Sequence, residues 1–301
     1  MIVIHTGKRA VPFLLLPAVA VPGILFLLFP SATRAAALAS LRLCGEKLIP
    51  ALFPFLVLTA LYRKVCPVPP RKPLLTVPLV GMTAGAPVGA DLVGGLYRAG
   101  AIGRKTASSL LFLCNTPSPA FLVLAVGEGM LGNRVLGWWL FFANVLASVL
   151  IGGVLFLTGG KSKKAEKKAP VPVPSSPVPE PVRFLPAVSA SVAEGALAML
   201  RISGAVVFFG TLSGLPISSP LGKALLAALT EITGGCAACA ALGGEKGLLL
   251  TAAAVGFSGL SVAAQVGFSA DGVPMGRYFL GKVLSALLTP MVFAIFLHFP
   301  I

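Results

Sequence analysis

Polar residues interrupt an apolar stretch in the first half of the chain. Asn115, Thr116 and Ser118 lie in the sequence CNTPSP, which stands between SSLLFL and AFLVLAV and also contains two prolines. Proline breaks the hydrogen-bond ladder of a helix, and the freed backbone groups are costly in hydrocarbon unless they line a protein cavity or bind something. We therefore expect these three side chains to contact a solute. The alternative is hydrogen bonding to neighbouring helices, which is common in membrane bundles.

A second apolar stretch carries a similar interruption. Ser258, Ser261 and Gln265 lie in GFSGLSVAAQV, close to the C-terminal end of the chain. When the chain is shifted by 140 residues, Ser118 falls on Ser258 without a gap. The two interruptions therefore belong to an internal repeat, and the second set of side chains joins the first as candidate solute-binding residues.

Two acidic residues occupy equivalent positions in this repeat. Asp91 lies in GAPVGADLVGG and Glu231 in TEITGG, and the 140-residue shift places one on the other. Carboxylates inside a membrane are costly and are functional candidates by default. Either could bind a coupling cation, take a proton, or pair with a base such as Arg98. The same two glycine-rich segments add Gly89 and Thr233 to the candidate solute-binding residues.

The composition is that of a membrane protein. Of the 301 residues, 56% are hydrophobic and 11% are charged, which is too few charges to cover a soluble domain. The net charge is +15, but much of it lies in short clusters that typically mark the cytoplasmic ends of membrane helices. No basic and aromatic module is present, so we expect no binding to nucleic acid.

Enzyme motifs do not occur in the apolar part of the chain. There is no HExxH, GxSxG or P-loop sequence, and the two histidines, His5 and His298, lie at the chain ends. Cys236 and Cys239 have CxxC spacing, but a second pair of the kind that zinc sites need is missing. We therefore expect no catalytic residue, no metal and no cofactor.

The apolar pattern divides the chain into four parts. Residues 1–48 hold an N-terminal span and an interfacial amphipathic helix, with a cleaved signal peptide as the alternative for the first segment. Residues 49–158 and 184–301 form two repeats, each with a hairpin, an interrupted span and a plain span. Residues 159–183 form a lysine- and proline-rich linker. The predicted fold class is an all-α polytopic membrane protein with two re-entrant helical hairpins and two interrupted transmembrane helices.

The basic clusters predict how the repeats are oriented. If the N-terminus is cytoplasmic, the pairs Arg71-Lys72 and Arg104-Lys105 and the lysines of the linker also lie inside. The first hairpin then enters the membrane from the inside and the second from the outside. Such an inverted-topology repeat is typical of secondary transporters, which bind their solutes near the membrane midplane.

The segment 85–133, GAPVGADLVGGLYRAGAIGRKTASSLLFLCNTPSPAFLVLAVGEGMLGN, resembles the sporulation integral membrane protein YlbJ (SpoVV) family, within the nucleoside-recognition or Gate domain group. LTEITGG (229–235) and GFSGLSVAAQV (256–266) are also similar to this family. The resemblance covers roughly 50–299 in two blocks. Asp91 stands where the family often has Lys, and Asn115-Thr116 stands where it often has Asn-Asn.

This resemblance implies a permease for a small anionic solute, dipicolinic acid, in the outer forespore membrane of a sporulating Gram-positive bacterium. Dipicolinate is a planar dianion, and helix N-termini and hydroxyls at a midplane site would suit it. The wider group resembles nucleoside transporters, so a nucleoside or another small solute is one alternative. A non-transporting scaffold of sporulation is another. The expected partners are this solute and the lipid bilayer, and a homo-oligomer is left open.

Overall fold

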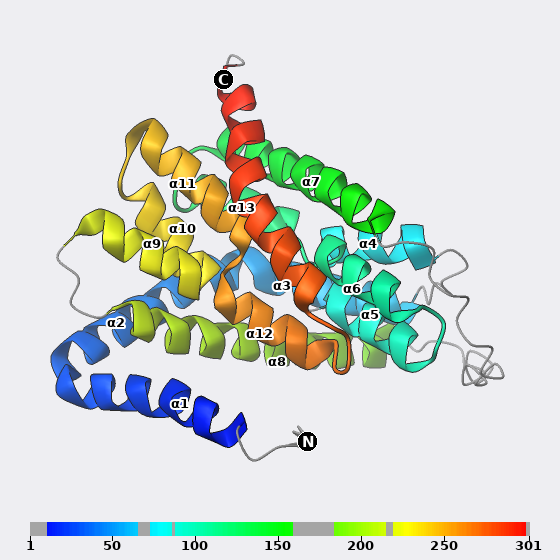
Figure 1. Cartoon of the computed structure of the whole chain (residues 1–301), viewed down its shortest axis with the longest axis horizontal. Coiled ribbons are helices and arrows are strands. Elements are labelled where there is room, and N and C mark those ends of the chain that lie inside the picture. Colours follow the sequence, from blue (N-terminus) through cyan, green and yellow to red (C-terminus); the bar gives the residue numbers. More distant parts are fainter. Residues whose placement is uncertain (1–10, 66–72, 86–87, 159–183, 215–218, 299–301) are drawn as a thin grey trace.

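The protein is built from helices that follow one another closely along the chain. The computed structural model describes residues 11–65, 73–85, 88–158, 184–214 and 219–298, so the predicted linker 159–183 lies outside the described residues. Every regular element within these ranges is a helix, and two of them, η1 and η2, have the wider turns of a π-helix (Figure 1). The elements are α1 (Val11–Leu28), α2 (Pro30–Leu43), η1 (Cys44–Leu48), α3 (Ile49–Val65), α4 (Pro73–Ala84), α5 (Val88–Arg98), α6 (Arg104–Leu113), η2 (Ala120–Glu128), α7 (Arg134–Leu157), α8 (Phe184–Ser213), α9 (Pro220–Thr230), α10 (Ile232–Ala240), α11 (Gly244–Phe257), α12 (Gly259–Ser269) and α13 (Gly276–Leu297).

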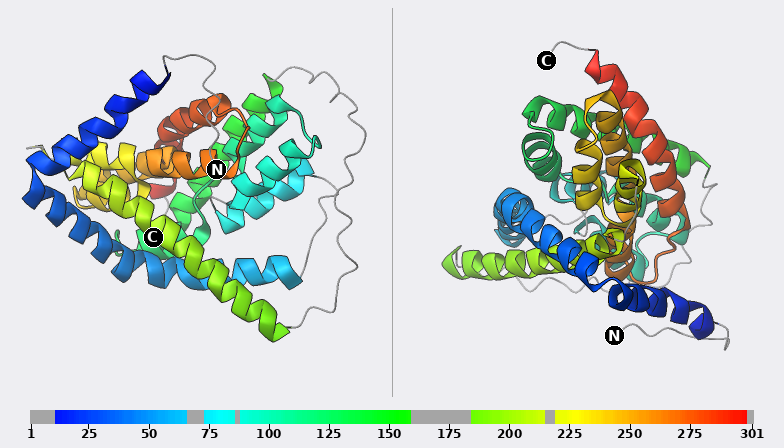
Figure 2. Two further views of the ribbon diagram at one scale, coloured as in Figure 1. Left: turned by 90° about the horizontal axis from the view of Figure 1, so that it is seen from below. Right: turned by 90° about the vertical axis from the view of Figure 1, so that its left-hand side faces the viewer.

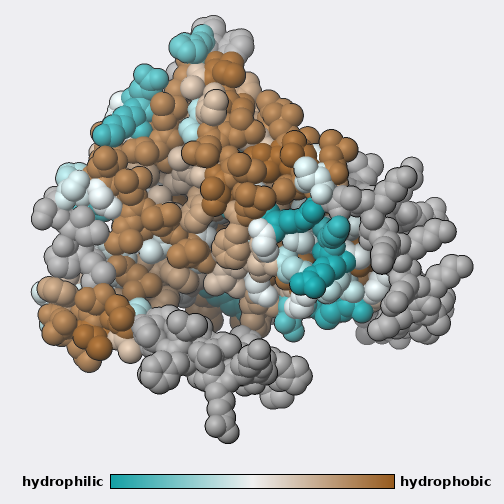
Figure 3. All heavy atoms as spheres, in the orientation of Figure 1, coloured by the Kyte–Doolittle hydropathy of each residue, from teal (hydrophilic) through white to brown (hydrophobic). Residues whose placement is uncertain are grey.

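Five helices among the described residues are long and apolar enough to cross a membrane. Large apolar side chains also cover much of the outside of the molecule, as the space-filling view shows, with hydrophilic residues gathered in separate patches (Figure 3). Lipid tails accept such a surface, whereas water does not. The prediction of an all-α polytopic membrane protein is therefore confirmed. The five helices are Pro30–Tyr62, Arg134–Leu157, Phe184–Ser213, Gly244–Ser269 and Gly276–Leu297.

The segment before the first hairpin is more continuous than the sequence indicates. Helices α2, η1 and α3 follow one another without a break, so the interfacial helix predicted within residues 1–48 continues directly into the helix of the next segment. The long helix α8 packs against both α2 and α3. The left view of Figure 2 shows α8 crossing the continuous α2–α3 helix at one side of the molecule.

The order of elements is the same in the two halves of the chain. Shifted by 140 residues, α6, η2 and α7 fall on 244–253, 260–268 and 274–297, close to the observed bounds of α11, α12 and α13. Each half also has a pair of short contacting helices before its interrupted segment, α4 with α5 and α9 with α10. The element order thus fits the predicted repeat, while the opposite orientation of the halves in a membrane stays a prediction.

Helix α13 packs against both α7 and α11, and its other face is exposed at the outside of the molecule (Figure 1). Two glycines allow this close packing. A Cβ atom at Gly256 of α11 would collide with the backbone of Ser285, and one at Gly281 would collide with the ring of Phe112 on α6. Helix α13 therefore lies directly against the interrupted segments of both halves.

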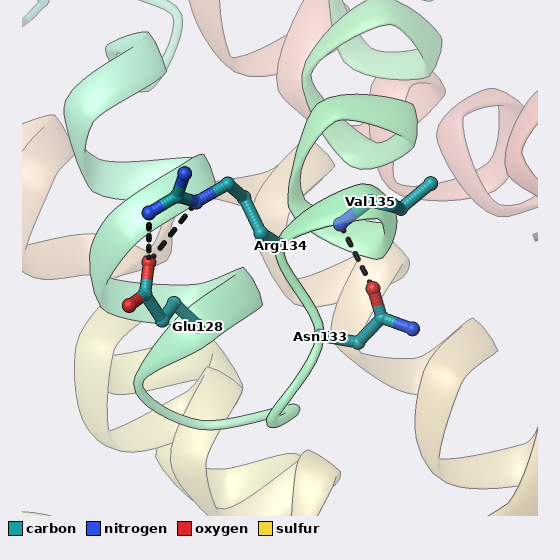
Figure 4. A network of polar contacts seen from close by, with 4 residues as sticks. All are labelled: Glu128, Asn133, Arg134 and Val135. Carbon is teal, nitrogen blue, oxygen red and sulfur yellow. Dashed lines mark hydrogen bonds and ion pairs between the residues drawn. The ribbon is translucent and has the colours of Figure 1, made fainter.

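The turn into α7 is held by side chains of its own segment. Asn133 Oδ1 accepts a hydrogen bond from the Val135 N–H at 2.8 Å and thereby caps the helix (Figure 4). The exposed side chains of Glu128 and Arg134 form an ion pair of 3.1 Å across the same turn. These contacts fix where η2 ends and α7 begins.

Candidate functional site

The first predicted break is present in the structure. Helix α6 ends at Leu113, and residues 115–118 have no helical structure before η2 begins. The Asn115 side chain donates from Nδ2 to the Leu111 carbonyl at 2.6 Å, which closes the end of α6. Among the described residues, the buried Asn115 Oδ1 and Thr116 Oγ1 atoms have no hydrogen-bond partner. This break therefore offers unused polar groups in a region where such groups are costly.

The second break is a single residue. Ser258 separates α11 from α12 and has a left-handed backbone with φ 69° and ψ 0°. This conformation is strained for a residue with a side chain. The buried Ser258 hydroxyl donates to the Val255 carbonyl at 3.0 Å. The break thus reorients the chain within one residue, whereas the first break needs four.

Each helical pair packs its turn against the break of its own half. The Cys114 carbonyl lies so close to Gly81 of α4 and Gly89 of α5 that a Cβ atom at either position would collide with it. In the second half, Gly259 has φ 75° and lies against the backbone of Glu231 and Ile232. Glycine is needed at these points because the two backbones touch.

Glu231 stands at the junction of α9 and α10 and is buried, with 2% of its surface exposed. Its carboxylate accepts a hydrogen bond from the Gly234 N–H at 2.6 Å, so it caps the N-terminus of α10. Asp91, its partner in the repeat, lies in the first turn of α5 and is exposed. The structure therefore gives the two predicted acids different surroundings.

One lysine connects the two breaks. Lys282 of α13 is buried, with 3% of its surface exposed, and its Nζ donates to the Asn115 carbonyl and to Ser258 Oγ, both at 2.8 Å. The same Nζ lies 6.0 Å from the ring centroid of Phe112 and 5.7 Å from that of Tyr278. The sequence-based prediction missed this residue because it considered only the acids among the intramembrane charges. The available signal was a lone lysine in the apolar run YFLGKVLSALL.

A cavity opens where the breaks and the two helical turns meet. Gly85 lines it from the first helical pair, and Glu231 and Thr233 line it from the second. Its apolar wall comes from α3, η2, α8 and α12, with Phe121 supplying an aromatic ring. The cavity is therefore mainly apolar, with a few polar groups from both halves, as solute sites commonly are. Its polar lining residues are Asn115, Ser118, Glu231, Thr233, Ser258 and Gln265.

The remaining predicted residues lie outside this lining. Thr116 is buried in the first break, and Gly89 is buried against the same break. Ser261 is buried in the first turn of α12, where its hydroxyl accepts from Gln265 Nε2 at 3.4 Å. Asp91 is exposed on α5, and no lining residue comes from that helix. The cavity thus unites six of the ten predicted residues and leaves four beside it.

Within the described residues, no group of three or more His, Cys, Asp or Glu side chains is arranged to hold a metal ion. Comparison with protein-family models, with curated proteins and with solved structures finds no match to this chain.

Proposed function

We propose that the protein is a permease that carries a small polar solute through the membrane, with its binding site in the cavity between the two breaks. The observation that carries this proposal is that both breaks line one cavity, together with the turns of both helical pairs. Backbone without helical hydrogen bonds is tolerated at membrane depth where it lines a cavity. Solute sites between two structural repeats are typical of secondary transporters.

A small anionic solute is the first candidate. The Lys282 ammonium places a buried positive charge behind Asn115 and Ser258, both of which line the cavity. Helices η2 and α12 begin at the two breaks, so their positive ends start there as well. Together with the resemblance of residues 85–133 to the YlbJ family, these features support dipicolinate as the transported molecule.

A nucleoside is the second candidate, and Glu231 is the reason. Its carboxylate lies in the cavity wall, and an ionised carboxylate disfavours a dianion nearby. A neutral solute avoids this repulsion, and the amides of Asn115 and Gln265 and the ring of Phe121 suit a nucleobase. The scaffold alternative is less well supported, because Asn115 Oδ1 and Thr116 Oγ1 have no partner among the described residues.

Uptake into liposomes that contain the purified protein tests the proposal. Labelled dipicolinate, a neutral nucleoside and an unrelated dicarboxylate are compared, with empty liposomes and an Asn115→Ala variant as controls. Saturable uptake of dipicolinate that the variant loses supports the first candidate, and the same result for the nucleoside supports the second. Absence of uptake and of binding for all three solutes, with any imposed gradient, refutes the permease.

A further inference from the structure

We infer that the Asn115 carbonyl, the Ser258 hydroxyl and the rings of Phe112 and Tyr278 form a binding site for a monoalkylammonium ion, which the tethered side chain of Lys282 fills. This inference goes beyond the proposed transport function and does not depend on the identity of the solute. It concerns the interactions of Lys282 that connect the two breaks.

The oxygen side of this site is suited to a cation. The Asn115 carbonyl follows the C-terminal end of α6, where the helix dipole is negative. The Ser258 hydroxyl donates its proton to the Val255 carbonyl, so its oxygen lone pairs remain for the ammonium. Two acceptors from opposite halves of the chain therefore converge on one nitrogen atom, each at 2.8 Å.

The aromatic side of the site selects an organic cation. Phe112 and Tyr278 each lie about 6 Å or less from Nζ, at the limit where a ring attracts a cation. No ion pair to Lys282 is present among the described residues, so these oxygens and rings are the groups that stabilise its charge. Glu231 also contacts the second break, but through its backbone against Gly259. The charge of Lys282 thus depends on a cage of neutral groups.

Shortening the lysine opens this cage to a free ion. Lys282→Ala removes three methylene carbons and the nitrogen, which are together the atoms of n-propylammonium. A ligand that binds only the folded state raises Tm, by roughly 2 °C at about ten times its Kd for a protein of this size. We therefore expect n-propylammonium to raise the Tm of detergent-solubilised Lys282→Ala in a saturable manner. Wild type has the cage filled and should show no such rise.

Two control variants and two control solutes distinguish the effect of charge from the effect of filling space. Lys282→Met fills the same volume without charge, and Lys223→Ala removes an exposed lysine of α9; neither should respond. Propanol has nearly the shape of propylammonium but no charge, and sodium chloride supplies ionic strength; neither should raise the Tm of Lys282→Ala. The double variant Lys282→Ala/Ser258→Gly lacks one acceptor and should need several-fold more propylammonium.

Because these experiments measure Tm, their outcomes test the inference whether or not the protein transports a solute. The inference is supported if Lys282→Ala is the only single variant that responds, and if propylammonium is the only one of the three solutes that raises its Tm. It is overturned if propanol or sodium chloride acts equally, if Lys282→Met responds as strongly, or if nothing raises the Tm. If Lys282→Ala folds only when propylammonium is present during expression, that recovery is support. If it folds in neither condition, a folded Lys282→Arg beside an unfolded Lys282→Met supports the cage, and any other result overturns it.

Discussion

Lys282 and Asn115 lie 167 residues apart in the chain and are joined by a hydrogen bond of 2.8 Å from Nζ to the Asn115 carbonyl. The same ammonium reaches Ser258, so the last helix ties together the interrupted segments of both halves. Any motion that separates the two breaks has to release one of these bonds. A buried ammonium that loses an acceptor is strongly destabilised, which makes Lys282 the contact on which the relative position of the breaks depends.

Ser258 is predicted to serve transport through its hydroxyl and the fold through both its hydroxyl and its backbone. Ser258→Gly accepts the positive φ without strain but removes the oxygen that accepts from Lys282 Nζ, so we expect it to lower the free energy of unfolding by about 1–3 kcal/mol. Loss of one hydrogen bond to the solute would raise the KM for uptake roughly tenfold. Ser258→Thr keeps the hydroxyl but places a β-branched residue at φ 69°, and we expect it to lose about 1 kcal/mol of stability.

Uptake kinetics and thermal unfolding of these two variants separate the roles. Ser191→Ala is the matched control, because Ser191 is a buried serine of α8 that bonds within its own helix and does not line the cavity. An unchanged KM for Ser258→Gly would remove Ser258 from the binding site.

Glu231 is predicted to act as a helix cap and as the site of a coupling proton or cation. Glu231→Ala removes the bond to the Gly234 N–H and should lower the free energy of unfolding by about 1 kcal/mol. Glu231→Gln keeps an oxygen acceptor but cannot ionise, so it should keep most of the stability while uptake loses its dependence on an imposed ion or proton gradient. Glu245→Gln, in the first turn of α11, is an exposed control. Gradient-dependent uptake that survives in Glu231→Gln would contradict the coupling role.

Asp91 is predicted to be dispensable for uptake, although the repeat pairs it with Glu231. It is exposed on α5, away from the cavity lining. Surface substitutions usually change free energies by less than about 0.5 kcal/mol, so Asp91→Asn should leave uptake within about twofold of wild type. Uptake measured with and without a gradient checks this expectation. If uptake lost its dependence on the gradient in Asp91→Asn but not in Glu231→Gln, the exposed Asp91 would be the coupling residue and this prediction would be wrong.

The packing of α5 on the first break gives a prediction for two glycines of one helix. A Cβ at Gly89 collides with the Cys114 carbonyl, so Gly89→Ala should lower the free energy of unfolding by about 2 kcal/mol. A Cβ atom added at Gly95 would have no neighbouring atom within 4 Å, so Gly95→Ala should be neutral or stabilising by up to about 1 kcal/mol. Denaturation of the two variants in detergent measures the difference. Equal effects would mean that α5 does not approach the break this closely.

Several features could be predicted from the sequence because they depend on local chemistry. The apolar composition requires a helical membrane protein, since helices satisfy their own backbone hydrogen bonds in lipid. Prolines and polar residues in CNTPSP locate the first break within a few residues, because proline cannot continue the helical ladder. The 140-residue repeat then locates the second break, even though Ser258 makes it by a left-handed backbone and not by proline.

Tertiary structure alone decided which of the predicted groups meet. Asp91 and Glu231 are equivalent in the repeat, yet one is exposed and the other is buried, because burial depends on which helices pack around each position. Thr116 lies between residues of the first break that line the cavity, but its side chain does not reach the lining. Lys282 became part of the site only through the register of α13 against both breaks, which Gly256 and Gly281 allow. Its acceptors come from residues 167 and 24 positions away, and the first of these contacts arises from helix packing, which no local sequence pattern encodes.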